Sequence, residues 1–232
     1  MSVALTLVGC GSSGGVPRVA QGWGACDPAN PRNSRRRCSA LLEASGADGK
    51  TLVLIDTSPD LRLQLIDAGV ARLDGVLMTH PHADHTHGID DLRPLVIAMR
   101  KRIEIHMNEA TSADLRAKFA YVFESPAGSS YPPILRERRL VAGTACVISG
   151  PGGPIEATPF ELSMATFQRS ASGSARSPIR LISTMFRPRA FRFSKISISG
   201  SSTRYGIRPI PVTSASARRS PGSNASSRAG RS

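Results

Sequence analysis

The pattern of apolar and polar residues over the first 161 positions predicts an α/β fold. Apolar residues gather in short runs of strand length, separated by segments with helical spacing or by Gly, Pro and Asn turns. The runs that predict strands are 3–9, 38–45, 51–56, 74–79, 102–107, 146–150 and 154–162. The second and third of these form a hairpin, because Ala47–Lys50 supply turn residues between them.

Two segments have the spacing of helices. The first is 59–69, which follows Ser58 as a predicted N-cap, begins with Pro59 and ends at Gly69. The second is 112–123, for which Ser112 is the predicted cap.

The pattern ends after Glu161. Residues 162–232 contain eighteen serines and thirteen Lys or Arg among 71 positions, and they contain no Asp, Glu or His. Such a composition cannot build a packed core, so it argues for disorder. We therefore divide the chain into a domain over 1–161 and a basic Ser/Arg-rich tail over 162–232.

The net charge of +13 belongs to this tail. Residues 1–161 carry seventeen acidic and seventeen basic side chains and are neutral. A basic tail gives salt-dependent affinity for nucleic acids or anionic surfaces. It has few aromatic residues and no folded motif around them, so we interpret this affinity as incidental and expect no specific nucleic-acid partner.

The cysteines and the hydropathy give further expectations. Cys10, Cys26, Cys38 and Cys146 are irregularly spaced, which fits neither a disulfide framework nor a CxxC zinc site. Cys26 or Cys38 could bind a structural metal, but a buried free thiol is the favoured interpretation. No run approaches the ~18 apolar residues of a membrane span. We predict a cytoplasmic protein without membrane contact, and a homodimer stays open.

Four of the five histidines lie in "LMTHPHADHTHG", directly after the predicted strand 74–79. Residues two apart in an extended segment point the same way, so His80 and His82 can reach one metal ion. Asp84 and His85 follow as the chain turns and can reach a neighbouring point. Imidazole and carboxylate suit Zn²⁺, with Mn²⁺ or Fe²⁺ as alternatives. The competing interpretation is a solvated histidine-rich loop.

The segment "THPHADH" resembles the signature of the metallo-β-lactamase superfamily. The segments "GCGSSGGVPR", "LIDTSPDLR" and "HADHTHGIDDLRPL" extend this likeness over about residues 3–161, toward the phosphoribosyl 1,2-cyclic phosphate phosphodiesterases. The resemblance implies an αββα sandwich and two zinc ions per chain. It places His80 and His82 on the first ion, Asp84 and His85 on the second, and Asp56 behind them. Asp84 is then also the catalytic residue that orients or deprotonates water.

Two further segments allow alternative interpretations. The glycine-rich loop Gly9–Gly15 could cradle phosphate, but it lacks a P-loop lysine, and the resemblance makes it a turn beside the active site. Arg35–Arg37 could contact phosphate or form a solvated basic turn. The family's extra zinc site uses several cysteines near position 26, and only Cys26 matches here.

The resemblance also requires a histidine, an aspartate and a last histidine further along, and the tail supplies none. The nucleotides from Met164 onward, read two bases later with synonymous third bases, can encode "GNIPALGFRIGAIAYTPDLND" and then "HPSHF". A His codon precedes this peptide if the codon of Ser163 ends in C. We therefore hypothesise a frameshift near Leu162, so that only the N-terminal half of the sandwich is correctly specified.

Three functions follow from the sequence. The first is a metal-dependent hydrolase of a small phosphate ester, most similar to a cyclic-phosphate phosphodiesterase, with a nuclease that processes RNA ends as the nearest variant. The second is an inactive frameshifted remnant. The third is a binder of anionic surfaces through the tail.

Overall fold

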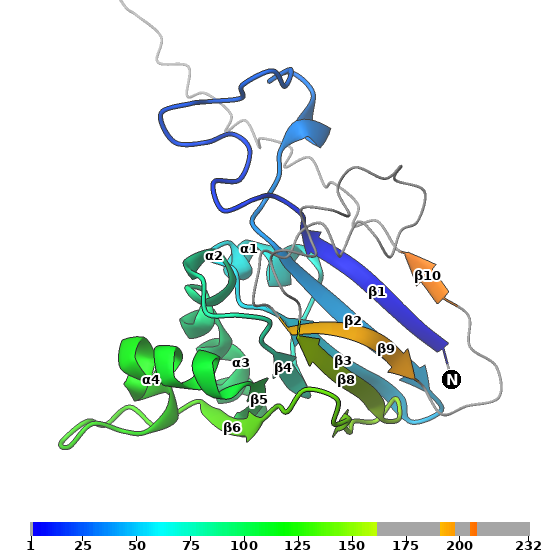
Figure 1. Ribbon diagram of the computed structural model, residues 1–232, viewed down its shortest axis with the longest axis vertical. Coiled ribbons are helices and arrows are strands. Elements are labelled where there is room, and N and C mark those ends of the chain that lie inside the picture. The colour runs from blue at the N-terminus through cyan, green and yellow to red at the C-terminus, as the bar shows by residue number, and fades with distance from the viewer. Residues whose placement is uncertain (1, 162–190, 198–204, 208–232) are drawn as a thin grey trace, which may run out of the picture.

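The structure is a computed structural model that describes residues 2–161, 191–197 and 205–207 (Figure 1). Its strands are β1 (Ser2–Gly9), β2 (Ser39–Gly46), β3 (Gly49–Ile55), β4 (Gly75–Leu77), β5 (Ile103–Met107), β6 (Leu135–Arg139), β7 (Cys146–Ile148), β8 (Ile155–Glu161), β9 (Phe191–Ser197) and β10 (Tyr205–Ile207). Its helices are α1 (Leu61–Asp67), α2 (Ala83–Thr86), α3 (Arg93–Met99) and α4 (Glu109–Phe123), with short 3-10 helices η1 (Pro31–Asn33) and η2 (Ile89–Leu92).

The strands form two sheets. The larger has the order β10-β1-β2-β3-β4-β5-β6, antiparallel from β1 to β3 and parallel from β3 to β6. The smaller is the antiparallel set β7-β8-β9. The predicted hairpin is confirmed, because Gly46 pairs with Gly49 and only two residues form its turn.

Each face of the larger sheet carries its own core. Leu41, Leu54 and Val76 pack with the helices in one cluster. Residues one position along the strands point the other way, so Leu42, Val53 and Leu77 pack with Ile148, Ile155 and Ala157 of the smaller sheet. The predicted α/β class is confirmed, with helices, large sheet and small sheet as successive layers. The second helical layer of the predicted sandwich lies outside the described residues.

Two short segments of the predicted tail lie among the described residues. β9 pairs with β8, and β10 lies parallel to β1. The other tail residues lie outside the described part of the chain, and the division of the chain at residue 161 and the disorder of 162–232 stay predictions. No helix in the described ranges is long and apolar enough to cross a membrane.

One edge of the larger sheet collects the chemically interesting segments. β3, β4 and β5 are parallel, so their carboxyl ends meet at this edge. β1 also ends there and β2 begins there, because each is antiparallel to its neighbour. The histidine-rich stretch follows β4 at this edge, and the long segment from Cys10 to Cys38 extends from it (Figure 1).

Both predicted helices exist, but both begin elsewhere than predicted. α1 starts at Leu61 and not at Pro59, and Asp60 precedes it with its side chain bound to Arg37. Ser58 still accepts a hydrogen bond from the Asp60 amide, two residues along, as the predicted cap would. α4 starts at Glu109, because Asn108 caps it by accepting a hydrogen bond from the Thr111 amide at 2.8 Å. Ser112 therefore lies inside this helix and is not its cap.

Several elements had no clear signal in the sequence. β6 reads Leu-Arg-Glu-Arg-Arg, which lacks an apolar run because the strand forms an edge of the sheet. α2 and α3 span only four and seven residues, too short for a helical period to be visible.

The two leucines of α1 test this packing. Leu61 is fully buried in the helix-side core, whereas Leu63 on the same helix is 46% exposed. We expect Leu61→Ala to lower the free energy of unfolding by about 2–5 kcal/mol, because it leaves a cavity in a packed core. The matched variant Leu63→Ala should cost less than about 1 kcal/mol. Urea denaturation followed by circular dichroism measures both, and equal losses would contradict this packing.

Candidate metal centre

The first pair of predicted ligands lies on the extended segment after β4. His80 is buried, and His82 is exposed and precedes α2 with extended backbone angles. His80 Nε2 and His82 Nδ1 are 3.1 Å apart. Two nitrogens that share a tetrahedral zinc ion lie about 3.3 Å apart, given Zn–N distances of about 2.0–2.1 Å. The structure thus brings this pair together at a spacing that fits one ion.

The second pair lies on α2, and it is adjacent to the first. Asp84 Oδ2 and His85 Nε2 are 3.6 Å apart, and the His80 and His85 ring centroids are 4.1 Å apart. His87, the remaining histidine of the stretch, turns away and makes an edge-on ring contact with Phe119 of α4 at 5.3 Å. The three imidazoles of the proposed ligands therefore gather beside one carboxylate, and His87 stands apart.

Asp56 links the segment after β4 to helix α2 through hydrogen bonds. Its carboxylate is fully buried and accepts hydrogen bonds from the Thr79 amide at 2.8 Å, the Thr79 hydroxyl at 2.7 Å and His85 Nδ1 at 2.7 Å. Its own backbone is left-handed, with φ of 60°, which is uncommon for a residue other than glycine. The supporting role that the resemblance implied for Asp56 agrees with these contacts.

Two threonines near the centre support the predicted ligands. The Thr79 hydroxyl lies 3.0 Å from His80 Nδ1, so it links His80 to Asp56. Thr57 binds the backbone oxygens of His85 and Thr86 through its hydroxyl, and its amide donates to His85 at 2.8 Å. Both threonines lie in segments that carry the family resemblance, but no role could be assigned to them from the sequence, and only the fold shows that they position the ligands.

The local electrostatics separate the two buried histidines. Burial, together with the neighbouring His85, lowers the pKa of His80 to about 4. Burial also opposes the protonation of His85, but the Asp56 carboxylate outweighs it and raises the His85 pKa above its usual value. His80 is therefore held neutral, which is the form that binds metals. The bond to Asp56 keeps a proton on His85 Nδ1 and leaves Nε2 facing Asp84.

The assembly is incomplete as a metal site within the described residues. No group of three or more His, Cys, Asp or Glu side chains is arranged there to hold an ion. Cys38 is buried, as the favoured interpretation expected, and burial raises its thiol pKa. Cys26 is half-buried and free. The ligand roles of His80, His82, Asp84 and His85 stay predictions.

The glycine-rich loop and the basic turn contact each other. The Gly11 amide donates a hydrogen bond to the Arg36 carbonyl oxygen. A Cβ at Gly9 would lie 1.9 Å from the Arg37 carbonyl oxygen. Arg37 forms a two-pronged ion pair with Asp60, which lowers the Asp60 pKa, and Arg36 pairs with Asp67 at 2.7 Å. Small residues in this loop therefore permit close approach of the chain's own backbone, and two of the three arginines bind the protein's own carboxylates.

Comparison with known proteins identifies similar sequences and folds. The profile of a family described as a β-lactamase superfamily domain matches residues 51–193. A curated octanoyltransferase of Porphyromonas gingivalis is 36% identical over 132 residues, which are 56% of this chain and 25% of that protein. The chain therefore spans a quarter of that relative, and the relative's activity describes a much longer protein.

Two solved structures extend the comparison. A diphosphatase from the PhnP family is 32% identical with a TM-score of 0.56, and the match covers 69% of this chain and 57% of that structure. Zinc-bound PqqB of Methylobacterium extorquens is 19% identical with a TM-score of 0.49, over 68% of this chain and 52% of that one. The chain spans little more than half the length of either structure.

Substitution of Asp56 tests the scaffold of this centre. Asparagine tolerates the left-handed backbone, so Asp56→Asn removes mainly the charge and one acceptor oxygen. We expect a loss of about 1–3 kcal/mol in the free energy of unfolding, because a buried partner of the carboxylate is left unpaired. The control Asp48→Asn lies in the exposed β2–β3 turn and should change little. Urea titration compares the two, and indistinguishable stabilities would contradict the scaffold role.

Proposed function

The chain belongs to the metallo-β-lactamase superfamily, a family of hydrolases, and from this membership we propose that it is a metal-dependent phosphodiesterase that opens a cyclic phosphate ester. The observation that carries the proposal is the gathering of three imidazoles and the Asp84 carboxylate at one sheet edge, above the buried Asp56.

The donor set fits divalent zinc, with manganese as the alternative. His80 and His82 offer one pair of donors, and Asp84 and His85 offer a second. Metal ions held there would lower the pKa of a water molecule and neutralise charge on a phosphate. The Asp56 bond fixes the His85 ring so that its Nε2 faces outward. Because its pKa is low, the His80 imidazole is neutral, and a ring nitrogen keeps the lone pair that binds a metal ion.

Asp84 is the residue that we place next to the reacting atoms. Its carboxylate is mostly shielded, with 18% of the side chain exposed, and it lies on the first turn of α2. We assign it to accept a proton from water as the water oxygen attacks phosphorus. One phosphorus–oxygen bond then breaks, and the ring of the cyclic ester opens to a monoester. The ester oxygen that leaves takes up a proton, so the overall reaction adds one water.

A cyclic phosphate ester of a ribose is the substrate that the resemblance suggests. The likeness to a diphosphatase of the PhnP family at 32% identity supports chemistry at phosphorus. The nearest variant is cleavage at an RNA end by the same centre. Comparing a cyclic ribose phosphate with a cyclic-phosphate-ended RNA as substrates distinguishes them.

His87 serves as a control for substitutions of the proposed metal ligands. We expect His80→Ala, His82→Ala and Asp84→Asn each to lower hydrolysis of bis(p-nitrophenyl) phosphate at least about 100-fold, because each removes a proposed ligand. His87→Ala removes a histidine that packs on Phe119 instead, and it should retain most of the activity. Zinc content after dialysis, measured by mass spectrometry, should fall in the same three variants. Metal-free and inert parent protein would contradict the proposal.

We propose as second candidate an inactive product of a shifted reading frame. It is favoured because residues 162–232 contain no His, Asp or Glu, and no three such side chains form a metal site in the described ranges. Catalytic zinc sites usually keep three protein ligands. On this proposal the first half of the centre exists, and the ligands that complete it are encoded in another frame.

Repair of the frame tests this second candidate. We expect a gene shifted by two bases ahead of Met164 to yield a protein that binds about two zinc ions, whereas the chain with its present tail binds neither tightly. The DNA of codons 160–165, read again from independent template, should show the shift. An unaltered frame together with full zinc binding by the present chain would overturn this candidate.

A further inference from the structure

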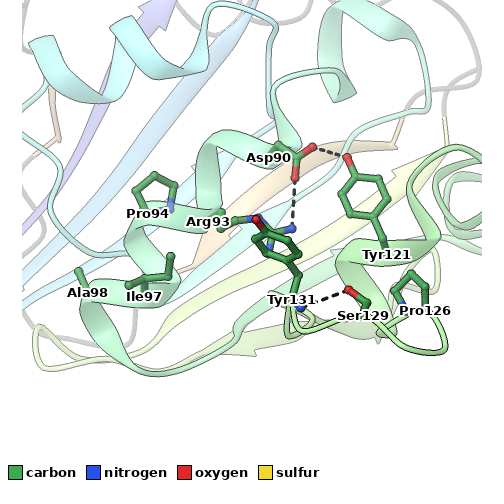
Figure 2. Close-up of a pocket in the computed structure, with 9 residues that line it drawn as sticks. All are labelled: Asp90, Arg93, Pro94, Ile97, Ala98, Tyr121, Pro126, Ser129 and Tyr131. Atoms are coloured by element: carbon green, nitrogen blue, oxygen red, sulfur yellow. Dashed lines mark hydrogen bonds and ion pairs between the residues drawn. The ribbon is translucent and has the colours of Figure 1, made fainter.

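A hollow of about 880 Å³ lies between α3, the end of α4 and the loop that joins α4 to β6 (Figure 2). This volume lies within the range of about 300–1,000 Å³ typical of small-molecule sites. Its residues take no part in the candidate metal centre. Asp90 nevertheless follows His85 by only five positions, so the hollow begins where the histidine-rich stretch ends.

The walls of the hollow are apolar and aromatic, and they are open to solvent. Pro94 and Ile97 of α3 form one side, and Tyr121, Pro126 and Tyr131 form the other (Figure 2). Ile97 is 67% exposed and Tyr131 is 70% exposed, so both are open to a ligand. The exposed Tyr131 ring offers a face on which a planar group can stack.

Two opposite charges lie together in the hollow. Asp90 accepts a hydrogen bond from the Tyr121 hydroxyl, and its Oδ1 lies 3.4 Å from the Arg93 guanidinium. Arg93 also donates to the Pro132 carbonyl oxygen at a long 3.3 Å. Because these contacts of Arg93 are long, it keeps N–H groups to offer, and Asp90 keeps acceptor capacity. The Asp90–Arg93 pair has no net charge. It therefore favours an uncharged ligand that has both hydrogen-bond donors and hydrogen-bond acceptors along one edge.

The loop that carries Tyr131 is held in place before any ligand arrives. Ser125 donates its hydroxyl to the Tyr131 carbonyl at 2.9 Å, and the Tyr131 amide donates to the Ser129 hydroxyl at 3.2 Å. The Ser129 amide in turn donates a hydrogen bond to the Pro126 carbonyl oxygen at 3.0 Å. The backbone of Tyr131 is therefore fixed on both sides while its ring stays exposed, which lowers the entropy cost of stacking.

We propose that this hollow binds the base of a nucleotide. A nucleobase is planar and uncharged, it has donors and acceptors along one edge, and it stacks on tyrosine and arginine planes. Asp90 would accept from the N–H groups of that edge, and Arg93 would donate to its ring nitrogen or carbonyl oxygen. Burial and Asp90 raise the pKa of Tyr121 to about 12, so its hydroxyl stays protonated and keeps orienting Asp90. The inference does not rest on the proposed function, since it requires no metal.

Equilibrium dialysis of the full chain in EDTA tests the proposal apart from the metal centre. The probes are AMP, GMP, CMP and UMP, with ribose 5-phosphate as the control that lacks a base. We expect at least one nucleotide to bind, and ribose 5-phosphate to bind at least tenfold more weakly. Equal binding of all five would show that only the phosphate is recognised, and it would overturn the proposal, as would binding of none.

Variants of Tyr131 locate the site. We expect Tyr131→Ala to raise the nucleotide Kd about tenfold, which corresponds to the loss of one stacking contact. Tyr131→Phe keeps the ring and should stay within about twofold. Val141→Ala removes an exposed apolar side chain outside the hollow and should have no effect. Nucleotide binding that is unchanged in Tyr131→Ala would overturn the assignment.

One further probe distinguishes the source of the base. A single-stranded RNA trinucleotide that binds no more tightly than the mononucleotide, with the same dependence on Tyr131, assigns the hollow to a free nucleotide. Tighter binding with that dependence assigns it to a strand end. Either result supports the proposal, and RNA binding that ignores Tyr131 contradicts it.

Discussion

The buried carboxylate of Asp56 is the contact on which the rest of the centre depends. A buried charge is costly unless it is fully hydrogen-bonded, and here two groups of Thr79 and the ring of His85 supply the bonds. These partners come from the segment after β4 and from α2, while Asp56 itself follows β3. One side chain therefore joins the end of β3 to the histidine-rich stretch, 23 to 29 residues further along the chain, at the sheet edge where the histidines lie.

The topology explains why the histidine-rich stretch can be so short. Parallel pairing from β3 to β5 aligns the ends of these strands, and the cores on both faces keep them rigid. The stretch needs no core of its own, because it is fixed at Asp56 and at Gly88, whose amide donates to Thr57 at 2.9 Å. A Cβ at Gly88 would lie 2.0 Å from the Ser58 carbonyl oxygen, so only glycine fits there.

The sequence predicted what local pattern can determine. Strand periodicity located β1 to β5, and the spacing of His80, His82, Asp84 and His85 placed the candidate ligands on one loop. It misplaced the starts of both helices, because α1 follows Asp60 and α4 follows Asn108 rather than the predicted caps Ser58 and Ser112. The role of Thr79 and the hollow beside Tyr121 could not be predicted, since both depend on how separate segments meet. The family profile confirmed the resemblance, while the ligand roles stay predictions.

The charged edge strand β6 has a consequence for how the molecule behaves at high concentration. Arg138 pairs with Glu104 of the neighbouring strand β5, and Arg139 pairs with Glu137 within β6 at 2.9 Å. A foreign strand that tried to extend the sheet at this side would have to bury or displace these charges. The side chains of β6 thus guard against fibril-like stacking of one molecule on another through this edge.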